Sequence, residues 1–236
     1  MIKILNSKKK NFNSSLNQLI LNRKNKIKFN SNLVTKIIND IKKNGDKALL
    51  KYEKKFGKNS IIFSRPKEAQ KQIKNLDKKV KKSIDLAYSR IFQFHSKQKV
   101  KNIFYTDKLQ NKLSYKYLPI ESVGIYVPGG TASYPSTVLM NAIPAIIAGV
   151  KRIVMVNPRN KGKQNSGVLY ASKKCGIKEI YSIGGAQAIA ALAYGTKKIT
   201  RVNKIVGPGN LYVTNAKKEI FGEVGIDMIA GPSEIT

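Results

Sequence analysis

The sequence predicts an α/β fold, in which helices cover both faces of a parallel sheet. Short apolar runs typical of buried strands lie at 123–127, 153–156, 179–183, 204–206 and 225–229. Segments with helical spacing of apolar residues separate them, near 136–149, 165–175, 186–195 and 210–221. This alternation of strand and helix is typical of a parallel sheet. A lysine-rich region with helical patterns precedes it, so we divide the chain into a mainly helical region, 1–120, and a sheet domain, 121–236.

The helical region is read from caps, breaks and periodicity. Ser31-Asn32 is suited to cap a helix that runs to about Lys43, the segment 44–46 interrupts it, and the helix resumes over 47–56. Alternation over 112–119 predicts a strand. The clearest helix follows Asn75, because its apolar residues recur at steps of three and four: Leu76, Val80, Ile84, Ala87, Ile91 and Phe94.

The charge of the chain is strongly basic, with 45 Lys and Arg against 13 Asp and Glu and a formal net charge of +32. Such a charge favours association with nucleic acid or anionic membranes. Only 6 of the basic residues are arginine, however, and nucleic-acid recognition depends heavily on arginine. The lysines also accompany many Asn and Ile residues, a bias that AT-rich codons produce. We expect no specific nucleic-acid function, and a basic nucleic-acid-binding protein stays as an alternative.

Membrane insertion and secretion are not predicted either. The longest apolar runs fall well short of the roughly 20 residues that cross a bilayer, and the first residues do not have the pattern of a secretory signal. Cys175 is the only cysteine, so no intrachain disulfide can form. The expected compartment is the cytoplasm.

Glycine-rich segments follow the predicted strands at 126–132, 184–187, 207–210 and 231–234. The carboxyl ends of parallel strands meet at one edge of the sheet, where ligands bind. Glycine allows close backbone approach, and a helix N-terminus offers N–H groups to a phosphate. None of these segments is the G-x-G-x-x-G dinucleotide motif. Four of them at successive strand ends nevertheless predict a ligand that carries phosphate.

Candidate catalytic groups are few. We expect His95 to be a structural histidine on the long helix, Cys175 to be a buried thiol, and Asp227 and Glu234 to have surface or structural roles. No His, Cys and carboxylate residues show metal-ligand spacing. From the residues alone, the chain is a ligand-binding α/β protein without a visible catalyst.

Five segments together resemble one enzyme family, the histidinol dehydrogenases. They are V-G-I-Y-V-P-G-G at 123–130, S-T-V-L-M-N-A-I-P-A at 136–145, G-G-A-Q-A-I-A-A-L-A at 184–193, V-G-P-G-N at 206–210 and D-M-I-A-G-P-S-E at 227–234. The resemblance is dense over 120–236 and looser, but compatible, before it.

The resemblance implies an NAD- and zinc-dependent enzyme that oxidises L-histidinol to L-histidine through L-histidinal, the last step of histidine biosynthesis. It implies an intertwined homodimer with two incomplete Rossmann-like domains. Residues 121–236 would form the NAD-binding one, and 1–120 would belong to a truncated first domain. Tyr126, Gln187 and Asn210 match family residues that contact NAD, and Ser233 matches one that contacts substrate.

In the family, the zinc ligands and the catalytic Glu-His pair come later than the last segment matched here. No catalytic or metal-binding residue can therefore be assigned in this chain, and we expect the polypeptide alone to be inactive. Two further alternatives join the nucleic-acid-binding one: a related NAD-dependent alcohol dehydrogenase of the same family, and a non-catalytic NAD-binding fragment.

Overall fold

The structure is a computed structural model that describes residues 4–25, 31–60, 62–63, 66–129, 134–160 and 162–229. Residues 1–33 and 34–236 form two separate compact units. Helix α1 (Phe12–Asn25) belongs to the first unit. The second unit contains the sheet and the helices discussed below. The division predicted at residue 120 stays a prediction.

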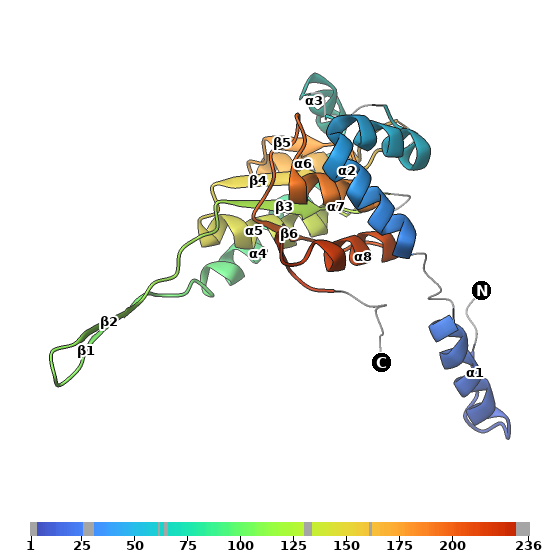
Figure 1. Cartoon of the computed structure of the whole chain (residues 1–236), viewed down its shortest axis with the longest axis horizontal. Helices are drawn as coiled ribbons and strands as arrows, with labels where there is room; N and C mark the ends of the chain where they lie inside the picture. Colours follow the sequence, from blue (N-terminus) through green and yellow to red (C-terminus); the bar gives the residue numbers. More distant parts are fainter. Residues whose placement is uncertain are drawn as a thin grey trace. The chain divides into compact units, whose positions relative to one another are not determined.

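A five-stranded parallel sheet forms the centre of the second unit (Figure 1). Its strand order is β5-β4-β3-β6-β7. Every residue of the central strand β3 is buried, as expected for a strand covered on both faces. The predicted α/β class is confirmed, and each predicted strand is present, with bounds β3 (Ser122–Tyr126), β4 (Arg152–Val156), β5 (Glu179–Tyr181), β6 (Lys204–Val206) and β7 (Gly225–Ile226).

Helices α5 and α6 cover one face of the sheet, and α7 and α8 cover the other. Ile125 and Met155 share a core with α5 and α6. Gly124, the neighbour of Ile125, faces α7, because a Cβ built on it would lie 3.0 Å from Leu192 Cδ1. Successive residues of a strand point to opposite faces, which separates the two layers. The four helices match their predicted ranges closely: α5 (Pro135–Ala148), α6 (Ser166–Lys174), α7 (Gly185–Tyr194) and α8 (Leu211–Ile220).

Helix α2 (Ser31–Tyr52) bends at Gly45, which has φ 49° and ψ −127°, so the break predicted over 44–46 is confirmed. A π-helical turn, Glu53–Gly57, continues the chain, followed by α3 (Pro66–Lys74). Asp77 begins α4 (Lys78–Ser96) by accepting hydrogen bonds from two backbone N–H groups, and Ile84 joins the α5–α6 core.

An antiparallel hairpin lies between α4 and the sheet. It consists of β1 (Ile103–Thr106) and β2 (Lys112–Tyr115), and every residue of both strands is exposed. The sequence predicted the second strand, which ends earlier than expected, and not the first. No helix of the described residues is long and apolar enough to span a bilayer.

The chain path places a ligand site at β3 and β6. From β3 the chain proceeds outward through β4 to β5, and α7 then carries it back to β6 on the opposite side of β3. The connections that follow β3 and β6 therefore diverge. Such a topological switch point leaves a crevice at the carboxyl ends of the two strands, where ligands of open α/β sheets bind.

Candidate functional site

The loops after β3 and β6 are in direct contact at this switch point. Gly207 follows β6 with φ +109°, a conformation that side chains rarely adopt. A Cβ on Gly207 would lie 2.2 Å from the carbonyl oxygen of Tyr126, the last residue of β3. Only glycine therefore allows these two loops to meet.

The loops after β3, β4 and β5 are joined through Pro158. A Cβ on Gly129 would lie 2.5 Å from Pro158 Cγ, and a Cβ on Gly184 would lie 2.8 Å from Pro158 Cβ. The neighbouring Asn157 donates from Nδ2 to the carbonyls of Val127 at 3.1 Å and Pro128 at 3.3 Å. Its buried Oδ1 has no hydrogen-bond partner among the described residues. The three loops thus pack against one another around Pro158, next to a buried Asn157 oxygen that has no hydrogen-bond partner in the part of the chain that the structure describes.

Tyr126 reaches from the end of β3 to the start of α7. Its side chain is buried, and Oη accepts a hydrogen bond from the backbone N–H of Gly185 at 3.0 Å. Burial raises the pKa of Tyr126 to about 12. The phenol therefore stays neutral near pH 7 and keeps a proton that it can donate to a ligand.

Gln187, in the first turn of α7, is also buried. Its Nε2 donates to Glu53 Oε1 at 2.9 Å, and the same oxygen accepts a bond from the backbone N–H of Gly184 at 2.9 Å. The structure thus brings Gln187 and Tyr126 together at one helix terminus. It directs the Gln187 amide nitrogen to a protein carboxylate.

Glu53 is a site residue that the sequence did not reveal. It is only 1% exposed, and burial raises the pKa of its carboxyl group above the usual value of 4.5. It stands in a lysine-rich helical segment 131 residues before Gly184. No local motif marks it, and only the fold shows that it faces α7.

Asn210 is the N-cap of α8. Its Oδ1 accepts hydrogen bonds from the backbone N–H groups of Tyr212 at 3.1 Å and Val213 at 3.2 Å. The amide nitrogen makes no hydrogen bond within the described part of the chain. Asn210 therefore has a structural oxygen and a nitrogen that can serve a ligand.

An ion pair between a buried lysine and a partly exposed aspartate holds the loop that follows β6. Lys217, 3% exposed, donates from Nζ to the Gly207 carbonyl at 2.8 Å and pairs with Asp227. Asp227 Oδ2 accepts a bond from the Gly207 N–H at 2.8 Å. Both backbone groups of Gly207 are thus bound from behind. The structural role expected for Asp227 is consistent with these contacts.

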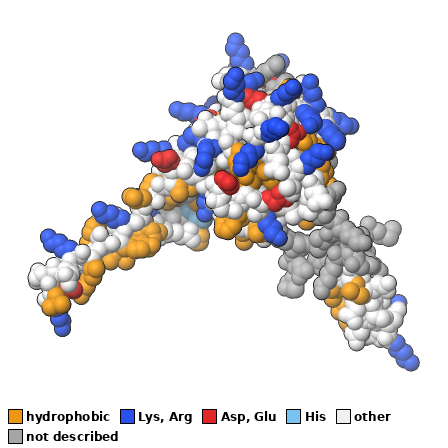
Figure 2. Space-filling view, in the orientation of Figure 1, with side chains coloured by type: hydrophobic (Ala, Val, Ile, Leu, Met, Phe, Trp, Pro, Cys, Tyr) orange, Lys and Arg blue, Asp and Glu red, His pale blue; other side chains and the backbone are white. Residues whose placement is uncertain are grey.

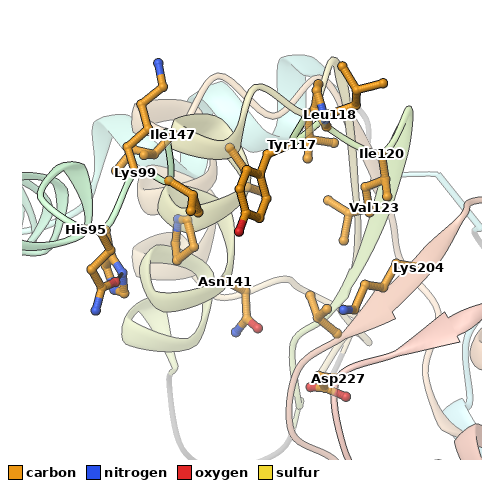
Figure 3. A pocket seen from close by; sticks show the side chains of 18 of the residues that line it. His95, Lys99, Tyr117, Leu118, Ile120, Val123, Asn141, Ile147, Lys204 and Asp227 are labelled. Atoms are coloured by element: carbon orange, nitrogen blue, oxygen red, sulfur yellow. Dashed lines mark hydrogen bonds between the residues drawn. The ribbon is translucent and has the colours of Figure 1, made fainter. Parts of the chain in front are cut away.

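A separate cavity of about 600 Å³ lies beside α5 and β6, and it touches this site only at Asp227 (Figure 3). Tyr126, Gln187 and Asn210 do not line it. Its walls are mainly apolar, with His95, Asn141 and Lys204 among the polar exceptions. His95 Nδ1 lies 2.6 Å from Gln98 Oε1, a local contact near the end of α4.

Three further candidates from the sequence are Ser233, Glu234 and Cys175. Ser233 and Glu234 lie outside the described residues. Cys175 is buried, which raises the pKa of its thiol to about 12 and leaves it unreactive near pH 7. Within the described ranges, no three His, Cys, Asp or Glu side chains gather closely enough to hold a metal ion.

Comparisons with known proteins agree with this geometry. The family model for histidinol dehydrogenase matches residues 21–236. The histidinol dehydrogenase of Pelagibacter ubique is 70% identical over 100% of this chain and 55% of its own length. That of Agrobacterium fabrum is 52% identical over 86% of this chain and 48% of its own.

Solved structures give the same result. A crystal structure of histidinol dehydrogenase from Elizabethkingia anophelis superposes with a TM-score of 0.83 at 41% identity, over 86% of this chain and 48% of that one. The chain spans about half the length of the curated relatives it matches. By sequence and by fold, it belongs to the histidinol dehydrogenase family.

Proposed function

We propose that the chain forms the NAD-binding part of an enzyme that oxidises L-histidinol to L-histidine through L-histidinal. The observation that carries this proposal is the meeting of the loops after β3, β5 and β6 around Tyr126. Those loops hold the three residues that the family resemblance assigns to NAD. Membership of the family supports the reaction.

In this proposal, Tyr126 and Asn210 contact the dinucleotide and Gln187 shapes its site. The Tyr126 phenol keeps its proton near pH 7 and can donate it to a ribose or amide oxygen. The Asn210 amide nitrogen can donate a second bond beside it. Bound NAD would accept the hydride that leaves the alcohol carbon.

Zinc is proposed for the enzyme as a whole. The described residues do not provide a set of ligands for it, so we assign no zinc-dependent step to them. Ser233 is proposed to contact the substrate. A cytoplasmic location stays a prediction.

A homodimer is also proposed, and the β1–β2 hairpin is the element that favours it. Large apolar side chains are exposed along it, namely Ile103, Phe104, Tyr105, Leu113 and Tyr115. Figure 2 shows hydrophobic side chains along the arm where Figure 1 labels β1 and β2. Contiguous apolar surface of this kind marks protein interfaces.

Calorimetric titration with NAD tests the binding proposal. Asn210→Ala removes both the cap and the free nitrogen, whereas Asn210→Ser keeps a capping oxygen and loses only the nitrogen. We expect both variants to bind NAD several-fold more weakly, and only Asn210→Ala to unfold at lower temperature. Affinity unchanged in Asn210→Ser and in Tyr126→Phe would remove these residues from the site.

An assay of NADH formation tests the reaction. The polypeptide is supplied with NAD, zinc and L-histidinol, with other small alcohols in parallel. We expect NAD binding without turnover for this polypeptide alone. Turnover of another alcohol in preference to histidinol would favour a related dehydrogenase of the same family.

A further inference from the structure

Two N–H groups at the N-terminus of α7 are already bound by side-chain oxygens of the protein. Glu53 Oε1 accepts the Gly184 N–H, and Tyr126 Oη accepts the Gly185 N–H. Free N–H groups at a helix N-terminus are what bind a ligand phosphate. The glycine-rich start of α7, which the sequence favoured as a phosphate site, therefore holds a carboxylate that belongs to the chain.

The surrounding chain is shaped to hold that carboxylate. Glu53 opens a π-helical turn, and Gly57 ends it. A Cβ on Gly57 would lie 2.6 Å from Glu53 Oε2, so the absence of a side chain there makes room for the carboxylate. Just beyond, Asn59 Nδ2 donates to the carbonyl of Ser182, after β5, at 2.7 Å. The segment 53–59 is thus hydrogen-bonded at both of its ends to the residues that follow β5.

We propose that Glu53 is a positioning residue of the dinucleotide site. Its carboxylate takes the place of a ligand phosphate at α7 and orients Gln187, while Tyr126 is held by the adjacent N–H. The phosphates of the dinucleotide are consequently kept from the N–H groups of Gly184 and Gly185 and lie nearer the loops after β3 and β6. This inference rests on the proposed function, because it concerns the same site.

Two features support a role beyond simple packing. First, one oxygen, Glu53 Oε1, binds both Gly184 and Gln187, so it sets the backbone and the side chain of the α7 first turn together. Second, Tyr126 Oη accepts the next N–H in the chain. Loss of Glu53 would therefore free a helix terminus beside the very tyrosine proposed to contact NAD.

The test uses the whole chain with Glu53→Ala, Glu53→Gln and Gly57→Ala, and Glu68→Gln as a matched control. Glu68 also forms polar contacts, to Arg159, but it is not part of this site. Amide NMR signals of Gly184 and Gly185 are followed during titration with inorganic phosphate, and NAD affinity is measured by calorimetry.

In the wild type and in Glu68→Gln, phosphate should leave both amide signals unmoved. In Glu53→Ala, phosphate should shift them saturably, and NAD affinity should fall about tenfold. Glu53→Gln keeps the volume of the side chain, and Gly57→Ala leaves Glu53 in place but adds a methyl group that displaces its carboxylate. Both should show the loss of affinity even if Glu53→Ala does not fold.

Equal NAD affinity in all folded variants, with Gly184 and Gly185 unresponsive to phosphate in Glu53→Ala, would overturn the inference. A different pattern separates the two proposals. If the wild type binds no NAD but Glu53→Ala exposes the α7 terminus to phosphate, the proposed function fails and the role of Glu53 at that terminus stands.

Discussion

Two buried charged side chains, Glu53 and Lys217, hold the backbone of the glycine-rich loops. Glu53 accepts the N–H of Gly184, and Lys217 donates to the carbonyl of Gly207. A glycine-rich loop has few side chains to pack, so its backbone conformation must be fixed by hydrogen bonds from neighbouring side chains. Side chains around this site therefore have two roles. Some fix the backbone of the glycine-rich loops, and others are available to contact a ligand.

Replacing Lys217 by Met should destabilise the fold by about 2–3 kcal/mol. The change leaves Asp227 without its cation and the Gly207 carbonyl without its donor, and breaking a buried pair costs about 3–5 kcal/mol. We expect a loss at or below the bottom of that range because the Asp227 side chain is 29% exposed. Urea denaturation measures the loss, and Lys218→Met, at the exposed next position, should be close to neutral. Equal stability of the two variants would contradict the importance of the pair.

Replacing Gly207 by Ala separates close approach from backbone strain. Gly207 and Gly222 have similar φ angles, +109° and +106°, but a Cβ meets Tyr126 only at Gly207 and nothing within 4 Å at Gly222. Gly222→Ala should cost about 1 kcal/mol, from conformation alone. Gly207→Ala should cost at least about 2 kcal/mol more and also weaken NAD binding. Thermal unfolding and calorimetry of both proteins provide the comparison.

At the scale of elements, the bend of α2 is fastened by Asp40. Its carboxylate accepts hydrogen bonds from Asn44, from Lys51 at 2.8 Å and from Tyr52 at 2.9 Å, so it connects the two arms of the bent helix. These bonds, with that from Lys51 the strongest, lower the pKa of Asp40 to about 2. The bend is therefore stabilised by an ionised carboxylate.

This stabilisation should depend on pH in a defined direction. Because the folded-state pKa lies below the ordinary value of 3.8, the contribution is complete above that value and is lost as the pH falls toward 2. The difference in unfolding free energy between wild type and Asp40→Asn should thus shrink between pH 5 and pH 3. Lys51→Met removes the main partner of Asp40, so it should also reduce the pH dependence of the unfolding free energy. The double variant should show no smaller pH dependence than Asp40→Asn alone. A difference that is constant with pH would contradict the assignment.

The sheet and its helices could be predicted because each element carries its own pattern. Buried strands read as apolar runs, and Asn165 and Asn210 stand at the helix starts they cap. The first strand of the hairpin carries no such pattern: Ile103, Phe104 and Tyr105 are consecutive and all exposed, so no alternation distinguishes an inner face. Helix α3 is short and largely polar, and it too gave no signal.

The site was predicted only as far as single segments allow. The glycine-rich loops and their place at the strand ends follow from the sequence, and so does the cap at Asn210. That Gln187 turns its amide to Glu53, and that Gly57 makes room for this carboxylate, depends on contacts between distant parts of the chain. Such contacts leave no periodicity or spacing to read.

At the scale of the whole molecule, the exposed hairpin should govern self-association. Phe104 is 69% exposed and Tyr115 is 59% exposed. Replacing both by Ser should lower the apparent mass in sedimentation at high protein concentration, with little change in melting temperature because neither side chain is buried. Phe221→Ser, at a site 67% exposed outside the hairpin, is the control. Equal association of all three proteins would count against an interface at the hairpin.

The basic charge should produce only weak, non-specific binding to DNA. On the face seen in Figure 2, Lys and Arg side chains are scattered over the surface instead of gathering in one patch. Affinity should fall steeply with salt, and a scrambled sequence of equal length should bind equally well, because contacts to phosphate carry no sequence information. Sequence-selective binding that persists at physiological salt would support the alternative of a nucleic-acid-binding protein.

Pro158 makes the loops after β3, β4 and β5 a single mechanical part. Because both Gly129 and Gly184 lie against the Pro158 ring, neither loop has room to move toward the ring unless the ring moves too. Thermal fluctuations of these loops should therefore be correlated rather than independent. A ligand that reduces the fluctuations of one loop would reduce those of its neighbours as well. The conformational entropy lost on binding is then that of one collective motion and not of three separate ones.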